Sequence, residues 1–136
     1  MTEVPSLRDP DDWITEGYDI HLIFDLNELA KATALFEAFV EFVESAQIAH
    51  HRPKIFPLPV GPWPTPMWQV LLPRGENSDR DLGRCVSWLM LNHGHFSVMV
   101  HPNTRADDER GGAIEDHSEN MFWIGSPRQL LLNVLT

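Results

Sequence analysis

Seven histidines in a chain of 136 residues are the first feature of this sequence that could carry chemistry. Imidazole is a common metal ligand and carries protons near neutral pH. Three histidines have a context that suggests a shared site: His21 and His101 lie in alternating segments, and His117 follows Asp116 in a polar stretch. Three neutral imidazoles, or two with a carboxylate, can hold a divalent metal and leave positions open for substrate and oxygen.

Whether these histidines converge depends on the strand face that each one occupies. In the segments 18–25 and 96–101, apolar residues recur at every second position and the histidine lies on the opposite face. If helices cover the apolar face, His21 and His101 both project from the open face of the sheet. Gln69 shares that face if its two neighbours in the chain point to the core. His117 then folds back over the same region.

Two amphipathic helices are expected to cover the apolar face. The apolar spacing predicts one helix over about 27–50 and a second over about 79–92. The six prolines of 53–66 predict an extended loop. The expected strands are 18–25, 67–72, 96–101 and one of 121–124 or 130–134.

This order predicts an α+β two-layer sandwich, with a sheet of about four strands and two helices on one face. The open face then needs cover, which a twofold homodimer would supply. Residues 1–16 are expected to form a flexible N-terminal arm, and residues 17–136 a single domain.

Composition and charge exclude several classes of protein. Ten Lys and Arg against twenty Asp and Glu give a formal charge of −10, so nucleic acids and anionic membranes are not expected partners. The single cysteine, Cys85, excludes an internal disulfide framework and lies on the apolar stripe of the second helix. No apolar run is long enough for a membrane span, and the acidic N-terminus does not fit a signal peptide, so we expect a cytoplasmic protein.

Four segments, in the same order and at compatible spacing, resemble the DOPA 4,5-dioxygenase-like family. They are YDIHLIFD, GPWPTPMWQV, WLMLNHGHFSVMVHPNT and DHSENMFWIG, and the resemblance spans about residues 18–135. It implies a ferredoxin-like fold, usually dimeric, and a non-haem Fe(II) enzyme that cleaves the ring of a catechol such as DOPA in secondary metabolism. By position in these segments, His21, His101 and His117 are implied as metal-binding and catalytic residues.

Two positions depart from the pattern of that family. Trp63 stands where the proline-rich loop of the family has a histidine, and an indole has only a donor N–H. Asn92 is followed by His93, where the family has an arginine. The aromatic residues near these segments could instead line a pocket for a small aromatic molecule or form core. The candidate substrate-binding residues are Trp63, Trp68, Gln69, Asn92 and Trp123.

Three functions remain as hypotheses at this point. The first is an iron-dependent dioxygenase-like enzyme with a small aromatic substrate. The second is a metal-independent isomerase or cyclase that uses the same histidines as acid and base on a small aromatic or polyketide-like metabolite. The third is a non-enzymatic dimer that binds small molecules.

Overall fold

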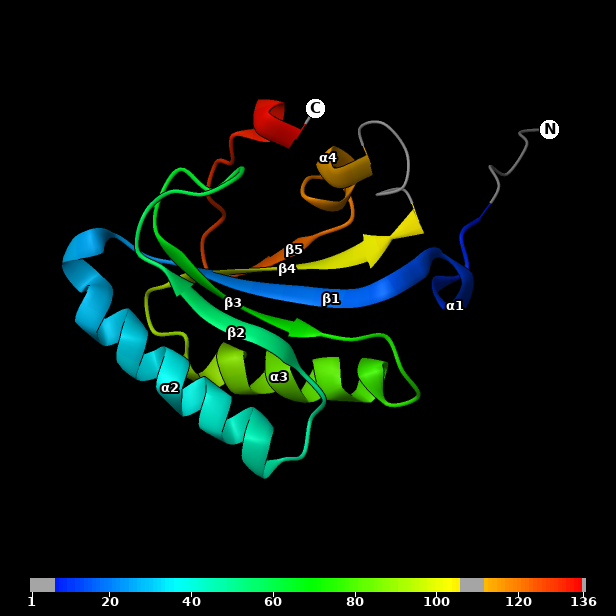
Figure 1. Cartoon of the computed structure of the whole chain (residues 1–136), viewed down its shortest axis with the longest axis horizontal. Coiled ribbons are helices and arrows are strands. Elements are labelled where there is room, and N and C mark those ends of the chain that lie inside the picture. Colours follow the sequence, from blue (N-terminus) through cyan, green and yellow to red (C-terminus); the bar gives the residue numbers. More distant parts are fainter. Residues whose placement is uncertain (1–6, 106–111, 136) are drawn as a thin grey trace.

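The computed structural model describes residues 7–105 and 112–135 (Figure 1). Five strands form one antiparallel sheet in the order β2-β3-β1-β4-β5, so that β1 is central. The strands are β1 (Ile14–Ile23), β2 (His51–Phe56), β3 (Met67–Leu72), β4 (Ser97–Thr104) and β5 (Phe122–Ile124).

Two long helices lie side by side on one face of this sheet, as Figure 1 shows. They are α2 (Leu29–Ser45) and α3 (Ser78–Asn92). Four short helices complete the described chain: α1 (Pro10–Trp13), η1 (Leu26–Glu28), α4 (Gly112–Asp116) and η3 (Leu132–Leu135). From β1 to β4 the order is strand, helix, two strands, helix, strand, the arrangement expected for a ferredoxin-like sandwich, and β5 adds a fifth strand.

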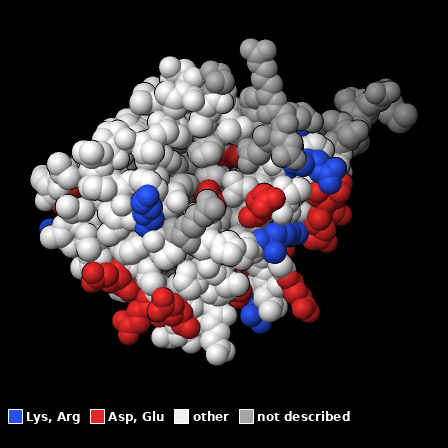
Figure 2. All heavy atoms as spheres, in the orientation of Figure 1, with Lys and Arg blue, Asp and Glu red and all other residues white. Residues whose placement is uncertain are grey.

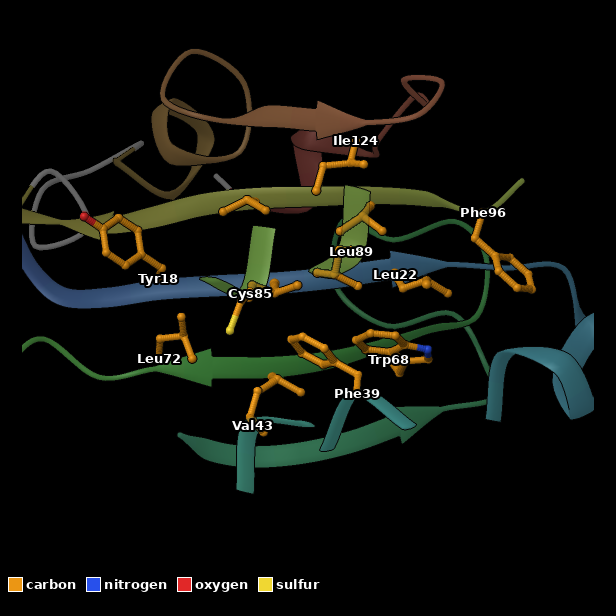
Figure 3. Packing of buried hydrophobic residues seen from close by; sticks show 14 of the residues in the cluster. Tyr18, Leu22, Phe39, Val43, Trp68, Leu72, Cys85, Leu89, Phe96 and Ile124 are labelled. Carbon is orange, nitrogen blue, oxygen red and sulfur yellow. The ribbon is translucent and has the colours of Figure 1, made fainter. Parts of the chain in front are cut away.

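The main core lies between the sheet and the two long helices (Figure 3). Alternation in β1 directs Ile20 and Leu22 into this core, because successive side chains of a strand point to opposite faces. Phe24, directly after the strand, enters the same core. Phe39 of α2 and Cys85 of α3 meet them from the helix side. The face assignment made from the alternating pattern is therefore confirmed, and so is the burial of Cys85.

The second sheet face is covered by the described chain itself. A smaller apolar cluster of Ile23, Trp63, Met67 and Met99 lies there. The β2–β3 loop, α4 and the C-terminal segment lie on this side of the sheet in Figure 1. Leu131 N–H donates to the carbonyl of Pro62, so the C-terminal segment is tied to the loop. A dimer is thus not needed to cover this face, and dimerisation stays a prediction.

The sheet has five strands, not about four, because part of the predicted proline-rich loop pairs with β3. β2 begins at His51 and includes Pro53, and its register with β3 shifts between His51 and Lys54. Proline has no N–H to donate, and an edge strand with an irregular register tolerates it. Of the two candidate final strands, 121–124 contains β5, whereas 130–134 overlaps the 3-10 helix η3.

The N-terminal segment expected as an arm enters the fold in its described part. α1 lies within it, and β1 already begins at Ile14. Arg8 forms an ion pair with Glu115 of α4, and Arg105 pairs with Asp12. Residues 1–6 of the predicted arm lie outside the described residues.

The surface agrees with the acidic composition. On the face seen in Figure 2, acidic side chains gather along the lower edge and on the right, and uncharged side chains cover most of the area between them. In the described part of the chain, no helix is long and apolar enough to cross a membrane.

Candidate metal centre

His21 and His101 meet on the sheet face opposite the long helices. β1 and β4 are neighbours, and their register places His21 across from Met99 and Asp19 across from His101. The Nε2 atoms of the two histidines are 3.2 Å apart, and their rings stack with centroids 5.2 Å apart. Both side chains are buried, with 4% and 1% of their surface exposed.

His117 joins these two residues from the turn that follows α4. Its ring centroid is 4.1 Å from that of His101 and 6.5 Å from that of His21. One ligand atom from each of the three histidines lies within 4.8 Å of the others. The three residues are 96 positions apart in the chain from first to last, and the structure brings them together as predicted.

Backbone carbonyls orient two of the three imidazoles. His101 Nδ1–H donates to the carbonyl of Pro102 at 2.9 Å, and His117 Nδ1–H donates to that of Ala113 at 2.7 Å. With the proton on Nδ1, each Nε2 keeps a lone pair for a metal, the arrangement found around ligating histidines. His21 Nδ1 is buried with no hydrogen-bond partner among the described residues.

Burial keeps the three imidazoles neutral. Loss of hydration lowers the pKa of His21 well below 6.5, and a positive charge on His101 or His117 would lower it further. Burial also lowers the pKa of His101 and of His117, although the carboxylate of Asp116 partly opposes both shifts. Neutral imidazole is the form that binds a metal, so the cluster remains able to ligate below the usual pKa of histidine.

Asp19 is a member of this site that the sequence reasoning did not select. Its Oδ2 lies 3.6 Å from His101 Nε2 and 3.8 Å from His21 Nε2, and Asn103 Nδ2 donates to its Oδ1 at 2.7 Å. Burial raises the pKa of Asp19 above 3.8. The signal was present in the sequence, because Asp19 precedes His21 by two positions and therefore shares its strand face.

Trp63 covers one side of the cluster. Its ring centroid is 4.3 Å from that of His21 and 6.1 Å from that of His117, and only 3% of the residue is exposed. It stands on the β2–β3 loop, held by the bond between Pro62 and Leu131. The indole thus lies directly against the site.

The other candidate substrate-binding residues divide between the two sides of the sheet. Gln69 pairs with His21 across β1 and β3 and shares its face, and Trp123 packs in the small apolar cluster beside Met99. Trp68 lies on the opposite face, fully buried under α2, where its indole N–H donates to Ala32 O at 3.1 Å.

Asn92 is also separated from the histidines. It ends α3, which covers the other face of the sheet, and its side-chain amide donates to the carbonyl of Trp88 at 2.8 Å. Trp68 and Asn92 therefore do not contact a ligand bound at the cluster. The reason is the same for both: the core helices require one sheet face, and the histidines use the other.

Asp116 secures the turn that carries His117. Its carboxylate accepts hydrogen bonds from Thr104 N, Thr104 Oγ1 and Asn120 Nδ2, at 3.0, 2.8 and 3.0 Å respectively. These bonds connect the end of β4 to α4. The carboxylate of Asp116 therefore anchors the backbone next to His117, and the carbonyl of Ala113 orients the imidazole ring itself.

A cluster of three histidines on one face of an antiparallel α+β sheet has donor atoms that could hold a metal ion. Comparison with known families identifies the class of protein. Residues 18–134 match the Dopa 4,5-dioxygenase family. The chain belongs to this family, as the segments quoted from its sequence predicted. The family points to a dioxygenase-like enzyme with a small-molecule substrate.

Individual proteins that are similar to this chain include a solved structure and a longer relative. The crystal structure of a putative dioxygenase from Nostoc punctiforme PCC 73102 superposes with a TM-score of 0.74 and 26% identity, over 95% of this chain and 96% of that one. An uncharacterized 21.2 kDa protein from Botryotinia fuckeliana is 35% identical over 80 residues, which are 57% of this chain and 40% of that protein. The chain thus matches less than half the length of the second relative.

Proposed function

We propose that this protein is a non-haem iron enzyme that cleaves the ring of a small catechol-type substrate, with Fe(II) bound by His21, His101 and His117. One observation carries the proposal: the two buried imidazoles of His21 and His101 and the half-buried imidazole of His117 present ligand atoms within 4.8 Å of one another. Membership of the dioxygenase family supports the same chemistry.

The residues present fit an iron ion by their donor chemistry. Imidazole nitrogen suits iron, and two of the three Nε2 lone pairs are fixed by carbonyl bonds on the far side of the ring. Two lone pairs that face each other at 3.2 Å repel unless a cation or a proton lies between them. When bound, Fe(II) would bring the catechol oxygens and molecular oxygen together for insertion of both oxygen atoms into the ring.

The chain itself contributes orientation and exclusion of water. The two strand histidines hold their positions because β1 and β4 are paired along eight residue positions. Trp63 shields one side of His21 from solvent.

Metal binding and oxygen consumption test this proposal directly. Protein purified without added metal is analysed for iron, then titrated anaerobically with Fe(II), and oxygen uptake is followed with a panel of catechols. We expect one Fe(II) per chain in the wild type and loss of that iron in His21→Ala and His101→Ala. His51→Ala, which changes an exposed histidine outside the cluster, is the matched control and should retain the iron.

The Trp63→His variant shows whether iron binding requires a histidine at this position of the loop. If the wild type binds no Fe(II) but this variant does, the imidazole absent from the loop is required and the wild type does not use iron. Absence of iron from both proteins, or iron without oxygen uptake on any catechol, contradicts the proposal.

A metal-independent isomerase or cyclase is the second candidate, because Trp63 occupies the loop position where the family has a histidine. Its indole fills space against His21 that a further metal-binding group would otherwise use. This candidate predicts turnover of a small aromatic or polyketide-like substrate that continues without oxygen and in the presence of a chelator. Loss of that turnover in His101→Ala, with binding retained, would distinguish it from a protein that only binds small molecules.

A further inference from the structure

Asp19 places a carboxylate oxygen within 4 Å of two Nε2 atoms of the cluster. Its side chain comes from the same strand as His21 and faces the partner strand at the position paired with His101. One carboxylate oxygen is held by Asn103, and the other is directed at the two histidines. The carboxylate thus has a fixed orientation, with one oxygen free for a further partner.

The three donor atoms of Asp19, His21 and His101 fit around one ion. Their separations are 3.2, 3.6 and 3.8 Å. Two donors that each lie about 2.1 Å from a shared ion are at most about 4.2 Å apart, and all three separations are below this limit. Asp19 Oδ2 lies too far from either Nε2 atom for a direct hydrogen bond, whereas the two Nε2 atoms are within hydrogen-bond distance of each other.

We propose that Asp19 is a direct metal ligand of this site, adding a carboxylate oxygen to the histidine nitrogens. This inference rests on the proposed iron site and extends its ligand set. It gives β1 two ligands, Asp19 and His21, at alternate positions of one strand, with His101 opposite them on β4. With His117 the ligand set becomes three histidines and one carboxylate, and both ligand types occur together in non-haem Fe(II) enzymes that use oxygen.

Asn103 fixes the orientation of the Asp19 carboxylate in this arrangement. Its amide donates to Asp19 Oδ1 and leaves Oδ2 for the metal, as residues outside a coordination sphere commonly do for ligating carboxylates. Because Asn103 is on β4, two residues beyond His101, the same pair of strands positions both the ligands and this supporting bond.

The test measures metal binding without any substrate. Fe(II) affinity is determined anaerobically by competition with a coloured chelator, and the visible spectrum of Co(II) bound at the site reports the ligand set. Asp19→Asn keeps the shape of the side chain and weakens it as a ligand, whereas Asp19→Glu keeps the carboxylate. Glu16→Gln is the matched control, because it removes the same charge from an exposed position of the same strand.

We expect Asp19→Asn to weaken Fe(II) binding by about tenfold or more and to change the Co(II) bands. Asp19→Glu should bind Fe(II) more tightly than Asp19→Asn, and Glu16→Gln should match the wild type. Circular dichroism checks that each variant is folded. If Asp19→Asn is not folded, the comparison of Asp19→Glu with the wild type still tests the inference.

Two results would contradict the assignment of Asp19 as a ligand without contradicting the proposed iron site. One is an Fe(II) affinity of Asp19→Asn equal to that of Glu16→Gln. The other is a Co(II) spectrum that is unchanged in Asp19→Asn, which would place Asp19 outside the coordination sphere. Failure of the wild type itself to bind Fe(II) or Co(II) would overturn the proposed function and this inference together.

Discussion

Acid should destabilise the metal-free protein steeply, because its site histidines are buried in the neutral form. Burial lowers the pKa of His21 and His101 in the folded protein, whereas histidine in the unfolded chain titrates near 6.5. Below that pH the unfolded chain therefore binds more protons than the folded protein. The stabilisation is fully present above pH 6.5 and is lost as the pH falls toward the folded pKa values.

The size of this effect follows from the number of buried histidines. Each one that is charged only in the unfolded chain contributes about 1.4 kcal/mol per pH unit to the slope of the unfolding free energy. His21 and His101 together contribute at most about 3 kcal/mol per pH unit, at a pH below 6.5 where both remain neutral in the folded protein. His117 contributes less because it is more exposed. The raised pKa of Asp19 has the opposite effect on stability, because the folded protein binds a proton at a pH where the unfolded chain does not. It offsets part of the loss of stability at the acid end of the range.

The assay is urea unfolding of chelator-treated protein at constant ionic strength, followed by circular dichroism between about pH 5 and about pH 7.5. The free energy of unfolding should be nearly constant in the upper part of this range and fall below pH 6.5. In His101→Gln the slope should decrease by about 1.4 kcal/mol per pH unit. In His51→Gln, which changes an exposed histidine, the slope should match the wild type.

Two outcomes would refute this reasoning. The first is a wild-type slope below about 1.4 kcal/mol per pH unit across the acid range, since that is less than one buried histidine supplies. The second is the same slope in the wild type and in His101→Gln. Either would mean that these imidazoles bind protons in the folded protein about as readily as in the unfolded chain.

Two further predictions concern residues beside the cluster and in the core. Asp116→Ala leaves the buried N–H and hydroxyl of Thr104 without this acceptor. We expect the free energy of unfolding in urea to fall by about 2–4 kcal/mol and metal binding through His117 to weaken. Unchanged stability would contradict this role of Asp116. Burial raises the pKa of the Cys85 thiol to about 12, so a thiol reagent should react slowly with the native protein and rapidly in urea; fast reaction without denaturant would show that the thiol is accessible.

Much of the site could be predicted from the sequence because strands alternate. The pattern around His21 and His101 placed both on the face opposite the apolar residues, and the structure confirms that placement. The same rule would have selected Asp19, two positions before His21. The same rule would also have excluded Trp68 from the site. Gln69 shares the sheet face of the histidines, so its neighbour Trp68 points to the opposite, apolar face.

Other features depended on signals that are weaker along the chain. Strand β2 was missed because Pro53 is typical of a loop, and only pairing with β3 at an edge of the sheet makes it a strand. The cover of the second sheet face was assigned to a dimer, but the β2–β3 loop and the C-terminal segment provide it. These segments have little periodicity, so their position depends on contacts such as that between Pro62 and Leu131.

The sequence by itself determined the α+β class, the face of each strand histidine and the family, because local periodicity and short motifs encode these properties. Only the tertiary structure decided which strands are neighbours and in what register they pair. That register puts Asp19 opposite His101, and the turn after α4 brings His117 over both strands. His21 and His101 are 80 positions apart, and the geometry of their contact depends on how the whole sheet assembles rather than on any local pattern.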